Sequence, residues 1–550
     1  MTNRLRSGRT LGVLVAAGAV LAPSAISAPP SLSIDRLGTY ATGLGDASGE
    51  TAAVERDRMF VTNSDDNSLD IVDVADPAAP RLVTRLDLSP YGDNPTSVDV
   101  DHGLVAVAVA ADPKTDNGRV AFFRTDGTPV GSAEVGALPD MVTFAGNGAR
   151  LLVANEGEPN SYGQPDSVDP EGSVSIINTS GYRGFLRMQN LPGAVRTVAF
   201  TDFNDGGRRH GQLPAGIRLN GPGASVAEDL EPEYITVQGG TAYVTLQENN
   251  AVAAIDINRG VVRSIMALGT KDHSLPGNGI DASDRDGGIN IARWPVKGMF
   301  MPDSLASFTV RGRSYIITAN EGDGRDYDGF VDEARVKDLT LDPVAFPNAA
   351  DLQKNENLGR LTVSATDGKN ADGSYSALYS FGARSATIWT TSGKQVWDSG
   401  DLFERVTAER APDAFNTTND ELAPDSRSDN KGPEPEGVAV GTVRGRSYAF
   451  VGLERIGGVM VLDVSKPDAP VFIDWVVNRD FTADPVGPDS GPEIIRFIDS
   501  SESPTRQSML MVANEVSGTV SLYDLGGRQG EDDAEDSDGR DRGEREGRGR

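Results

Sequence analysis

The fold is decided by a C-terminal stretch that reads Pro492-Glu-Ile-Ile-Arg-Phe-Ile498, then Met509-Leu-Met-Val-Ala-Asn-Glu515, then Ser517-Gly-Thr-Val-Ser-Leu-Tyr-Asp524. In it an acid follows a proline, a strand-like run ends in Asn-Glu, and a glycine turn leads to another strand-like run. The same order recurs about seven or eight times, with a period of roughly 40 residues that is typical of β-propeller blades. The clear copies run from Pro139-Asp140 to Asn155-Glu156, from Pro232-Glu233 to Gln247-Glu248, from Pro302-Asp303 to Asn320-Glu321 and from Pro435-Glu436 to Leu453-Glu454, and weaker copies start at Glu50 and at Pro95-Thr96.

The number of blades depends on how residues 321–375 are interpreted. If they are an insertion within one blade, the chain is an all-β propeller of about seven blades, which is the fold that we predict. If Leu361-Thr-Val363 and its neighbours form a unit of their own, the ring has about eight blades. The last unit ends at residue 525 after its third strand, and residues 33–41 can supply the fourth. Pairing of the two ends would close the ring and leave no exposed sheet edge.

The two ends of the chain differ from the repeat. Residues 1–27 contain basic residues, then an apolar run, then small residues, which is the order of a secretory signal peptide. We therefore expect a secreted, periplasmic or extracellular protein with a single propeller domain over residues 33–525. Residues 526–550 combine Gly with Asp, Glu and Arg and should form a disordered charged tail. No segment after the leader is apolar and long enough to span a membrane.

Four segments interrupt the repeat, near residues 201–232, 270–298, 321–375 and 402–433. All are rich in Gly, Asp, Asn and Pro, and loops of this length are usually functional or disordered. Because their flanking strands start and end near the repeated acids, we expect these insertions on one face of the ring.

Composition limits the chemistry. The net charge of −30 argues against nucleic acid and anionic membranes as partners and favours cations. The chain has no Cys and 3 His, so thiolate catalysis and a multi-histidine metal site are excluded or nearly so. With 81 Asp and Glu residues, a site for a hard cation such as Ca²⁺, built from oxygen ligands, stays open.

The repeat predicts a ring of carboxylates at one end of the central channel. One acid starts the first strand of most blades and another follows the second strand, and antiparallel pairing brings both to the same rim. Such carboxylates repel one another unless they are protonated, paired with Arg, or bound to cations. The alternative is that they are blade-closing elements that hydrogen-bond to turn amides. The candidate calcium ligands in this ring are Asp140, Glu156, Glu233, Glu248, Asp303, Glu321, Glu436, Glu454, Glu493 and Glu515.

A second kind of acidic site is suggested within the insertions. Asp323, Asp326 and Asp328 belong to a segment with the [Asp/Asn]-x-Asp-Gly order of a calcium loop, and residues 284–287 and 370–373 share it. The closing Glu of an EF-hand is missing from each, so plain surface turns are the alternative interpretation.

The chain lacks the sequence motifs of common hydrolases. It has no Gly-x-Ser-x-Gly elbow, Walker loop or His-Glu-x-x-His sequence. Any hydrolysis would therefore depend on metal-bound water. Arg325, Arg335 and Arg455 lie close in sequence to repeated acids and are the candidates for binding an anion such as phosphate.

Several long motifs resemble the choice-of-anchor I family, which includes mesenchyme-specific cell surface glycoproteins and members labelled alkaline phosphatase. The resemblance covers essentially the whole chain after the leader and implies a secreted or surface propeller. Residues 435–438, Pro-Glu-Gly-Val, are also similar to phytase-like esterase propellers. The motifs that carry the family resemblance are Asp202-Phe-Asn-Asp205 with Glu231-Pro-Glu-Tyr234, Asn320-Glu-Gly-Asp323 with residues 327–338, and Leu378-Tyr-Ser-Phe-Gly-Ala-Arg384 with Ile388-Trp389.

Two functions follow from these observations. In the first, which we favour, the protein is a non-catalytic, calcium-binding module that interacts with a cell-surface or matrix component. In the second, it is a calcium-dependent phosphoester hydrolase that acts on a small phosphoester through metal-bound water at the acidic channel mouth.

Overall fold

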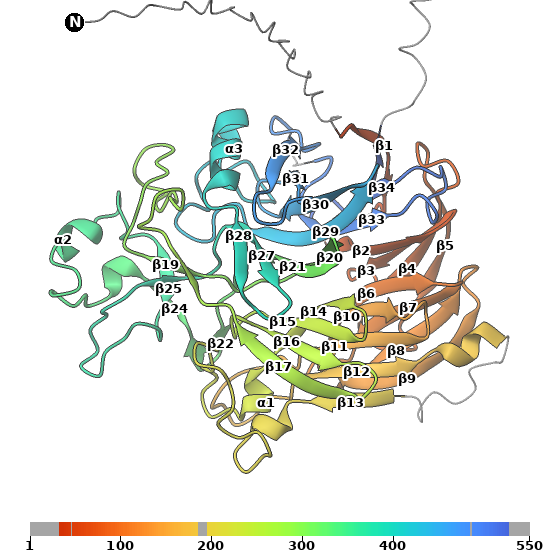
Figure 1. The fold of residues 1–550 in the computed structure, drawn as a ribbon, viewed down its shortest axis with the longest axis horizontal. Coiled ribbons are helices and arrows are strands. Elements are labelled where there is room, and N and C mark those ends of the chain that lie inside the picture. Colours follow the sequence, from red (N-terminus) through yellow and green to blue (C-terminus); the bar gives the residue numbers. More distant parts are fainter. Residues whose placement is uncertain (1–31, 46, 185–194, 484–486, 527–550) are drawn as a thin grey trace, which may run out of the picture. The chain divides into compact units, whose positions relative to one another are not determined.

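The computed structural model describes residues 32–45, 47–184, 195–483 and 487–526. The predicted signal peptide, residues 1–27, and the predicted tail beyond residue 526 lie outside the described residues. Within them the chain is built mainly from β-strands (Figure 1).

The described residues contain seven four-stranded antiparallel sheets, which we number as blades 1 to 7 along the chain. Blade 1 consists of β2 (Ser48–Glu55), β3 (Arg58–Asn63), β4 (Ser68–Asp73) and β5 (Arg81–Asp87), and blade 2 of β6 (Asn94–Asp101), β7 (Leu104–Ala110), β8 (Asn117–Arg124) and β9 (Pro129–Ala137). Blade 3 consists of β10 (Pro139–Ala145), β11 (Arg150–Asn155), β12 (Ser173–Asn178) and β13 (Val195–Ala199), and blade 4 of β14 (Pro232–Gln238), β15 (Thr241–Leu246), β16 (Ala251–Asp256) and β17 (Val261–Ala267).

The remaining three blades complete the set. Blade 5 consists of β20 (Leu305–Val310), β21 (Arg313–Asn320), β27 (Ser385–Thr390) and β28 (Gln395–Asp398), and blade 6 of β29 (Pro435–Val443), β30 (Arg446–Leu453), β31 (Val459–Asp463) and β32 (Val471–Val476). Blade 7 consists of β33 (Pro492–Ile498), β34 (Met509–Asn514), β35 (Thr519–Leu525) and β1 (Ile34–Ala41).

The first strands of the blades contact one another in a closed cycle. The order is β2, β6, β10, β14, β20, β29, β33 and back to β2. The cycle is completed by the chain's N-terminal strand, since β1 pairs with β35 from Ile34 opposite Leu525 to Ala41 opposite Thr519. The β-propeller class and closure by the N-terminal strand are therefore confirmed.

The strand β7 shows why these sequences form blades. Its residues Leu104–Ala110 alternate between valine and either leucine or alanine, and all are buried. Ala106 and Ala108 pack in the core shared with blade 3, while Val105 and Val107 pack in the core shared with blade 1. Each sheet thus buries both faces against its neighbours. For this reason a strand such as β7 is apolar at every position.

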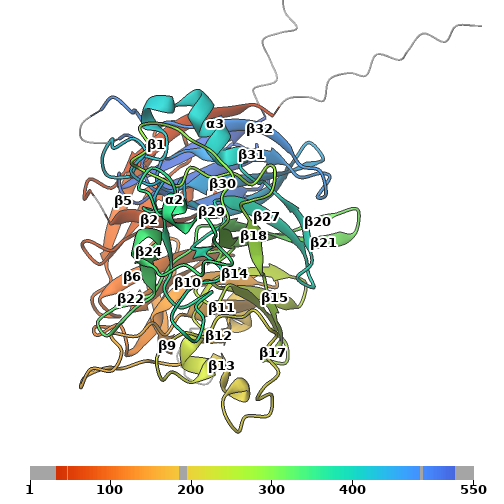
Figure 2. The same ribbon diagram turned by 90° about the vertical axis from the view of Figure 1, so that its left-hand side faces the viewer.

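The long insertions all connect at the end of the blades where the first strands begin. Residues 270–298 and 321–375 pack together around a core of their own that includes Ile280, Val296 and Leu358. We call this unit the cap; its elements α2, β24 and β25 lie to one side of the seven blades (Figures 1 and 2). Outside the blades the elements are α1 (Val226–Asp229), β18 (Thr270–Asp272), β19 (Lys297–Met299), β22 (Asp326–Tyr327), β23 (Phe330–Val331), β24 (Glu333–Arg335), α2 (Ala349–Leu352), β25 (Thr362–Ser364), β26 (Tyr379–Ser380) and α3 (Leu402–Arg410).

None of the helices within the described ranges has the length and apolar character needed to cross a lipid bilayer.

The closing strand is attached to blade 1 by a buried side-chain contact. The hydroxyl of Tyr40 on β1 donates a hydrogen bond of 2.7 Å to Asp70 on β4. Asp70 is fully buried and also accepts from Arg85 on β5, with an Nε–Oδ1 distance of 2.6 Å. The contact joins the two ends of the ring across a blade boundary.

We expect Tyr40→Phe to lower the free energy of unfolding by about 1–3 kcal/mol, because it removes a hydrogen bond to a buried carboxylate. Urea denaturation followed by tryptophan fluorescence measures the change. Tyr91→Phe is the matched control, since the Tyr91 hydroxyl has no hydrogen-bond partner within the described chain. Equal stability of the two variants would contradict a closing role for Tyr40.

Candidate functional site

The repeated acids lie where the blades begin. In five blades the pairing of the first two strands is interrupted by a β-bulge at this point, immediately after the proline. A bulge releases a residue from the hydrogen-bonded ladder and redirects its side chain. The acids that lie in these bulges are Asp140, Glu233, Glu436 and Glu493.

A second acid lies beside each of these positions. Pro139 pairs with Asn155, and Pro492 pairs with Asn514, so the acid that follows the second strand is next to the bulge. We call the two sets together the carboxylate ring. Its members are Glu50, Asp140, Glu156, Glu233, Glu248, Asp303, Glu321, Glu436, Glu454, Glu493 and Glu515. Blade 2 interrupts it, because Thr96 takes the place of the acid and donates its hydroxyl to the carbonyl of Pro139.

Burial and mutual repulsion raise the pKa of several of these carboxyl groups. Burial is the largest cause in each of them, and neighbouring carboxylates add to it. The pKa of Asp140 rises to about 6, that of Glu248 to about 7 and that of Glu454 to about 8. The pKa of Asp303 is raised well above its ordinary value by burial and by acids from other blades, among them Asp140 and Glu454. The acids therefore face one common space.

Three carboxylates of the ring have an oxygen without a partner. Glu233, Glu248 and Glu436 are 7%, 6% and 9% exposed. In each, Oε2 is buried and accepts no hydrogen bond from the described residues. Buried polar atoms normally have partners, so these oxygens mark a place where a proton or a cation would be stabilised.

One side of the ring is neutralised by the chain itself. Carboxylate oxygens of Glu321, Glu434 and Glu454 lie within 4.8 Å of one another, a spacing that could suit a metal ion. However, Lys431 Nζ lies 2.6 Å from Glu321 and 3.2 Å from Glu434, and Arg455 lies 3.0 Å from Glu434 and 3.1 Å from Glu454. Although burial opposes ionisation of Glu434, nearby cations outweigh it and lower its pKa to about 2. Glu321 and Glu434 are therefore held by ion pairs, whereas burial and the nearby Glu434 keep the pKa of Glu454 raised in spite of Arg455.

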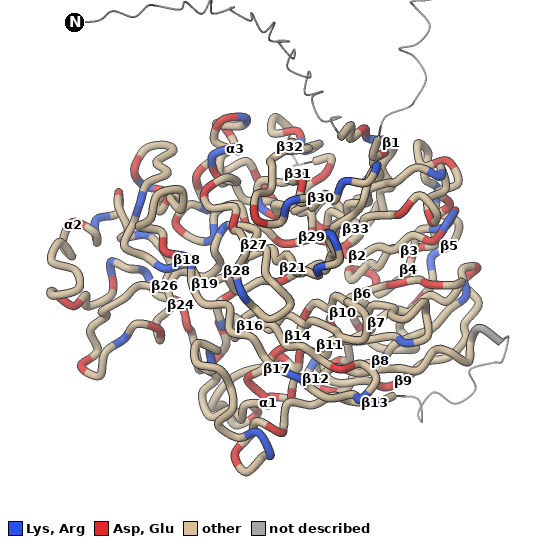
Figure 3. The backbone as a smooth tube through the Cα atoms, in the orientation of Figure 1, with Lys and Arg blue, Asp and Glu red and all other residues tan. Residues whose placement is uncertain are grey.

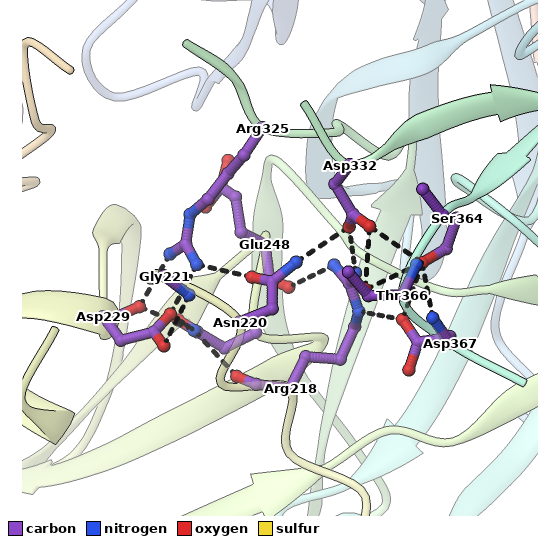
Figure 4. Close-up of polar contacts among 12 residues, drawn as sticks. Arg218, Asn220, Gly221, Asp229, Glu248, Arg325, Asp332, Ser364, Thr366 and Asp367 are labelled. Carbon is purple, nitrogen blue, oxygen red and sulfur yellow. Dashed lines mark hydrogen bonds and ion pairs between the residues drawn. The ribbon is translucent and has the colours of Figure 1, made fainter. Parts of the chain in front are cut away.

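The arginines that the sequence suggested for anion binding are paired with acids of the same chain. Arg325 lies 2.5 Å from Asp229 (Figure 4). It also lies 3.0 Å from Glu231. Arg335 lies 2.9 Å from Asp429 in the neighbourhood of the cap. Together with Arg455, all three have a carboxylate partner.

A buried network joins residues 321–375, the insertion within blade 5, to residues 201–232, the insertion that precedes blade 4. Arg218 binds Asp332 and lies 2.8 Å from Asp367, and it also donates to the carbonyl of Glu248 at 2.9 Å (Figure 4). This network fixes the backbone next to a ring carboxylate.

The acids proposed as a calcium loop do not gather around one point. Asp323, Asp326 and Asp328 are exposed, and Asp326 and the segment after it form the short hairpin of β22 and β23. Only Asp323 approaches the ring, at 3.8 Å from Lys431. In the second Asp-Gly segment, Asp284 lies 2.9 Å from Arg360 and so has a cationic partner within the chain.

Several charged residues of the site are not marked by the sequence repeat. Glu231, Glu434 and Lys431 contribute charge at the ring but do not occupy the repeated positions. A signal existed, because Glu-Pro-Glu occurs at both 231–233 and 434–436. Lys431 could not be found in this way, since its partner Glu321 lies on another blade.

Comparisons with known proteins agree with the fold. The sequence profile of the Choice-of-anchor I domain matches residues 50–467. Gigasin-3a of Magallana gigas is 30% identical over 193 residues, which cover 32% of this chain and 67% of that protein. Mesenchyme-specific cell surface glycoprotein of Strongylocentrotus purpuratus is 31% identical over 303 residues, which cover 48% of this chain and 39% of that protein. The match therefore spans well under half of the Strongylocentrotus protein.

Among solved structures, hydrazine synthase of Kuenenia stuttgartiensis is similar to this chain with a TM-score of 0.43 and 14% identity. The alignment covers 87% of this chain and 96% of that one. A likeness at this level carries no functional argument, and the fold assignment above rests on the sheets themselves.

The raised pKa values predict the direction of pH dependence. In the unfolded chain these carboxyl groups ionise near pH 4–4.5, whereas in the folded protein they retain protons up to about pH 6–8. Over this window the folded state binds more protons than the unfolded state, so a rise in pH lowers stability. In chelator-treated protein we expect the free energy of unfolding to fall by on the order of a few kcal/mol between pH 5 and pH 8.

Urea titrations at both pH values test this, with two matched variants. Glu233→Gln should stabilise the protein at pH 8 more than at pH 5, because it removes a buried acid. Glu409→Gln, on the exposed surface of α3, should change neither value. A stability that rises towards pH 8 would show that the ring acids are ionised and compensated in the folded protein.

Proposed function

Because the chain belongs to the choice-of-anchor I family, we propose that it is a surface or secreted β-propeller interaction module that holds calcium at the carboxylate ring. The relative named as a cell surface glycoprotein supports the surface location. A partner in the cell surface or matrix fits a propeller that presents a charged face with large insertions.

The observation that carries the calcium proposal is the set of partnerless oxygens on Glu233, Glu248 and Glu436. Calcium takes 6–8 oxygen ligands in flexible geometry, from carboxylates, amides, carbonyls and water. A divalent cation in the ring would replace the protons that these acids otherwise retain, and it would offset the repulsion among acids of different blades. Within the described residues, the group of three carboxylates with oxygens within 4.8 Å of one another is the ion-paired group Glu321, Glu434 and Glu454. An ion held by the other ring acids would therefore need water molecules to complete its coordination.

The proposed ligands are ring acids that form no ion pair. Glu321, Glu434 and Glu454 already have cationic partners, and a metal ion there would have to displace them. Glu233 and Glu436 themselves form no ion pair with a Lys or Arg within the described ranges, although the flanking Glu231 and Glu434 do.

Phosphoester hydrolysis gains no comparable support. Arg325, Arg335 and Arg455 were the candidates for holding phosphate, and each is bound to a carboxylate of the chain. Hydrolysis therefore stays a hypothesis from the sequence.

The calcium proposal is tested by the melting temperature at pH 8 after chelation, with and without added Ca²⁺. We expect stabilisation of the wild type, by about 2.7 kcal/mol when calcium is 100-fold above Kd. In a Glu233→Gln/Glu436→Gln double variant the calcium increment should be lost. The same variant should melt higher than the wild type in chelator, because the repulsion is smaller. These opposite signs distinguish loss of a ligand from loss of the fold.

Two controls accompany this experiment. Glu409→Gln should keep the full calcium increment, and Mg²⁺ should give a smaller one, because it demands stricter octahedral geometry. A wild type whose melting temperature ignores calcium, or a double variant that keeps the increment, would contradict the proposal.

A further inference from the structure

A groove of about 690 Å³ lies between blades 5 and 6, at the end opposite to the carboxylate ring. It is formed by three turns: the one between β20 and β21, the one between β27 and β28, and the one between β31 and β32. Each of these turns follows a strand that starts at the ring end, so the meander places all three at the far end. We call it the basic groove.

Its charge differs from that of the rest of the protein. Four cations, Arg311, Arg313, Lys394 and Lys466, line it against one carboxylate, Asp468. The chain as a whole carries −30, and Figure 3 shows acidic residues throughout the described strands and loops. All four cations are exposed, and none of them has an ion-pair partner in the part of the chain that the structure describes. Most cations elsewhere in the folded part are paired, so this cluster is set apart.

The three turns are held in place by their own hydrogen bonds. Arg311 and Gly312 have φ values of 51° and 75°, as in the two-residue hairpin turn that suits strand twist. The amide of Thr390 donates to the carbonyl of Lys394 at 2.8 Å, and the amide of Ala469 donates to the carbonyl of Lys466 at 2.9 Å. The cationic side chains therefore project from rigid positions, which lowers the entropy cost of binding.

The wall of the groove is partly apolar. Tyr315 lines it together with Val310 and Val396. The ring of Tyr315 is stacked on Phe308, with centroids 5.6 Å apart, and this contact fixes its orientation. An aromatic surface beside separated cations suits a ligand that has both apolar faces and anionic groups.

We propose that the basic groove binds the sulfate esters of an acidic polysaccharide, with sugar rings packed against Tyr315. Arginine and lysine at fixed spacing bind tetrahedral oxyanions through charge-assisted hydrogen bonds. A nucleic acid fits less well, because proteins that bind single strands stack successive bases on several aromatic side chains, and Tyr315 is the one aromatic residue that lines this groove. The site is separate from the carboxylate ring, and its binding does not depend on calcium.

The test uses the full chain and fluorescently labelled heparin, with chelator present, in a polarisation titration. We expect saturable binding that weakens as salt rises, because the contacts are exposed ion pairs. Arg313→Glu/Lys394→Glu should raise Kd by roughly tenfold or more. Arg56→Glu/Arg124→Glu, which reverses two charges at exposed positions of blades 1 and 2, should leave Kd within about twofold. Arg313→Lys/Lys394→Arg keeps the charges and should retain binding.

Comparison probes identify the ligand chemistry. Uncharged dextran should not compete, and polyphosphate should compete less well than dextran sulfate, since it has no sugar ring to contact Tyr315. The proposal is overturned if the double charge reversal binds heparin as the wild type does. It is equally overturned if dextran or polyphosphate competes as well as dextran sulfate, or if binding requires calcium.

Discussion

Closure of the ring is the constraint on which the rest of the structure depends. Seven sheets can contact one another in a cycle only if their first strands converge on a common axis. Any residue that recurs at the start of those strands is then brought close to its copies. The repeated acids obey this rule, and a repulsive cluster is the direct consequence of combining a sequence repeat with circular symmetry.

The repulsion is offset by cations of the chain at some of these acids and not at others. Beside blades 5 and 6, Lys431 comes from the insertion of residues 402–433 and Arg455 from the turn between β30 and β31. The low pKa of Glu434 reflects its pairing with both cations. Glu233 and Glu436 form no such ion pair within the described ranges, and burial and neighbouring acids raise the pKa of both. The same repeat thus yields acids with cationic partners and acids without them, and our calcium proposal concerns the second group.

Charge is also divided between the two ends of the propeller. The ring end carries the insertions and the acids, whereas the basic groove lies where the hairpin turns of blades 5 and 6 meet. A molecule that binds cations at one end and anionic polymer at the other is suited to connecting charged components of a surface or matrix. The rigid blades between the two sites keep them apart.

The sequence by itself determined the blades and the position of the repeated acids. These follow from local rules. Side chains alternate along a strand with a period of two, and the register of strand pairing shifts immediately after the proline, at the acid. Tertiary structure alone decided which acids are neutralised and where the cations gather. Lys431 reaches Glu321 across 110 residues, and Arg313, Lys394 and Lys466 come from three turns of two blades. Such meetings depend on how the sheets pack around the axis, and no spacing in the chain encodes that distance.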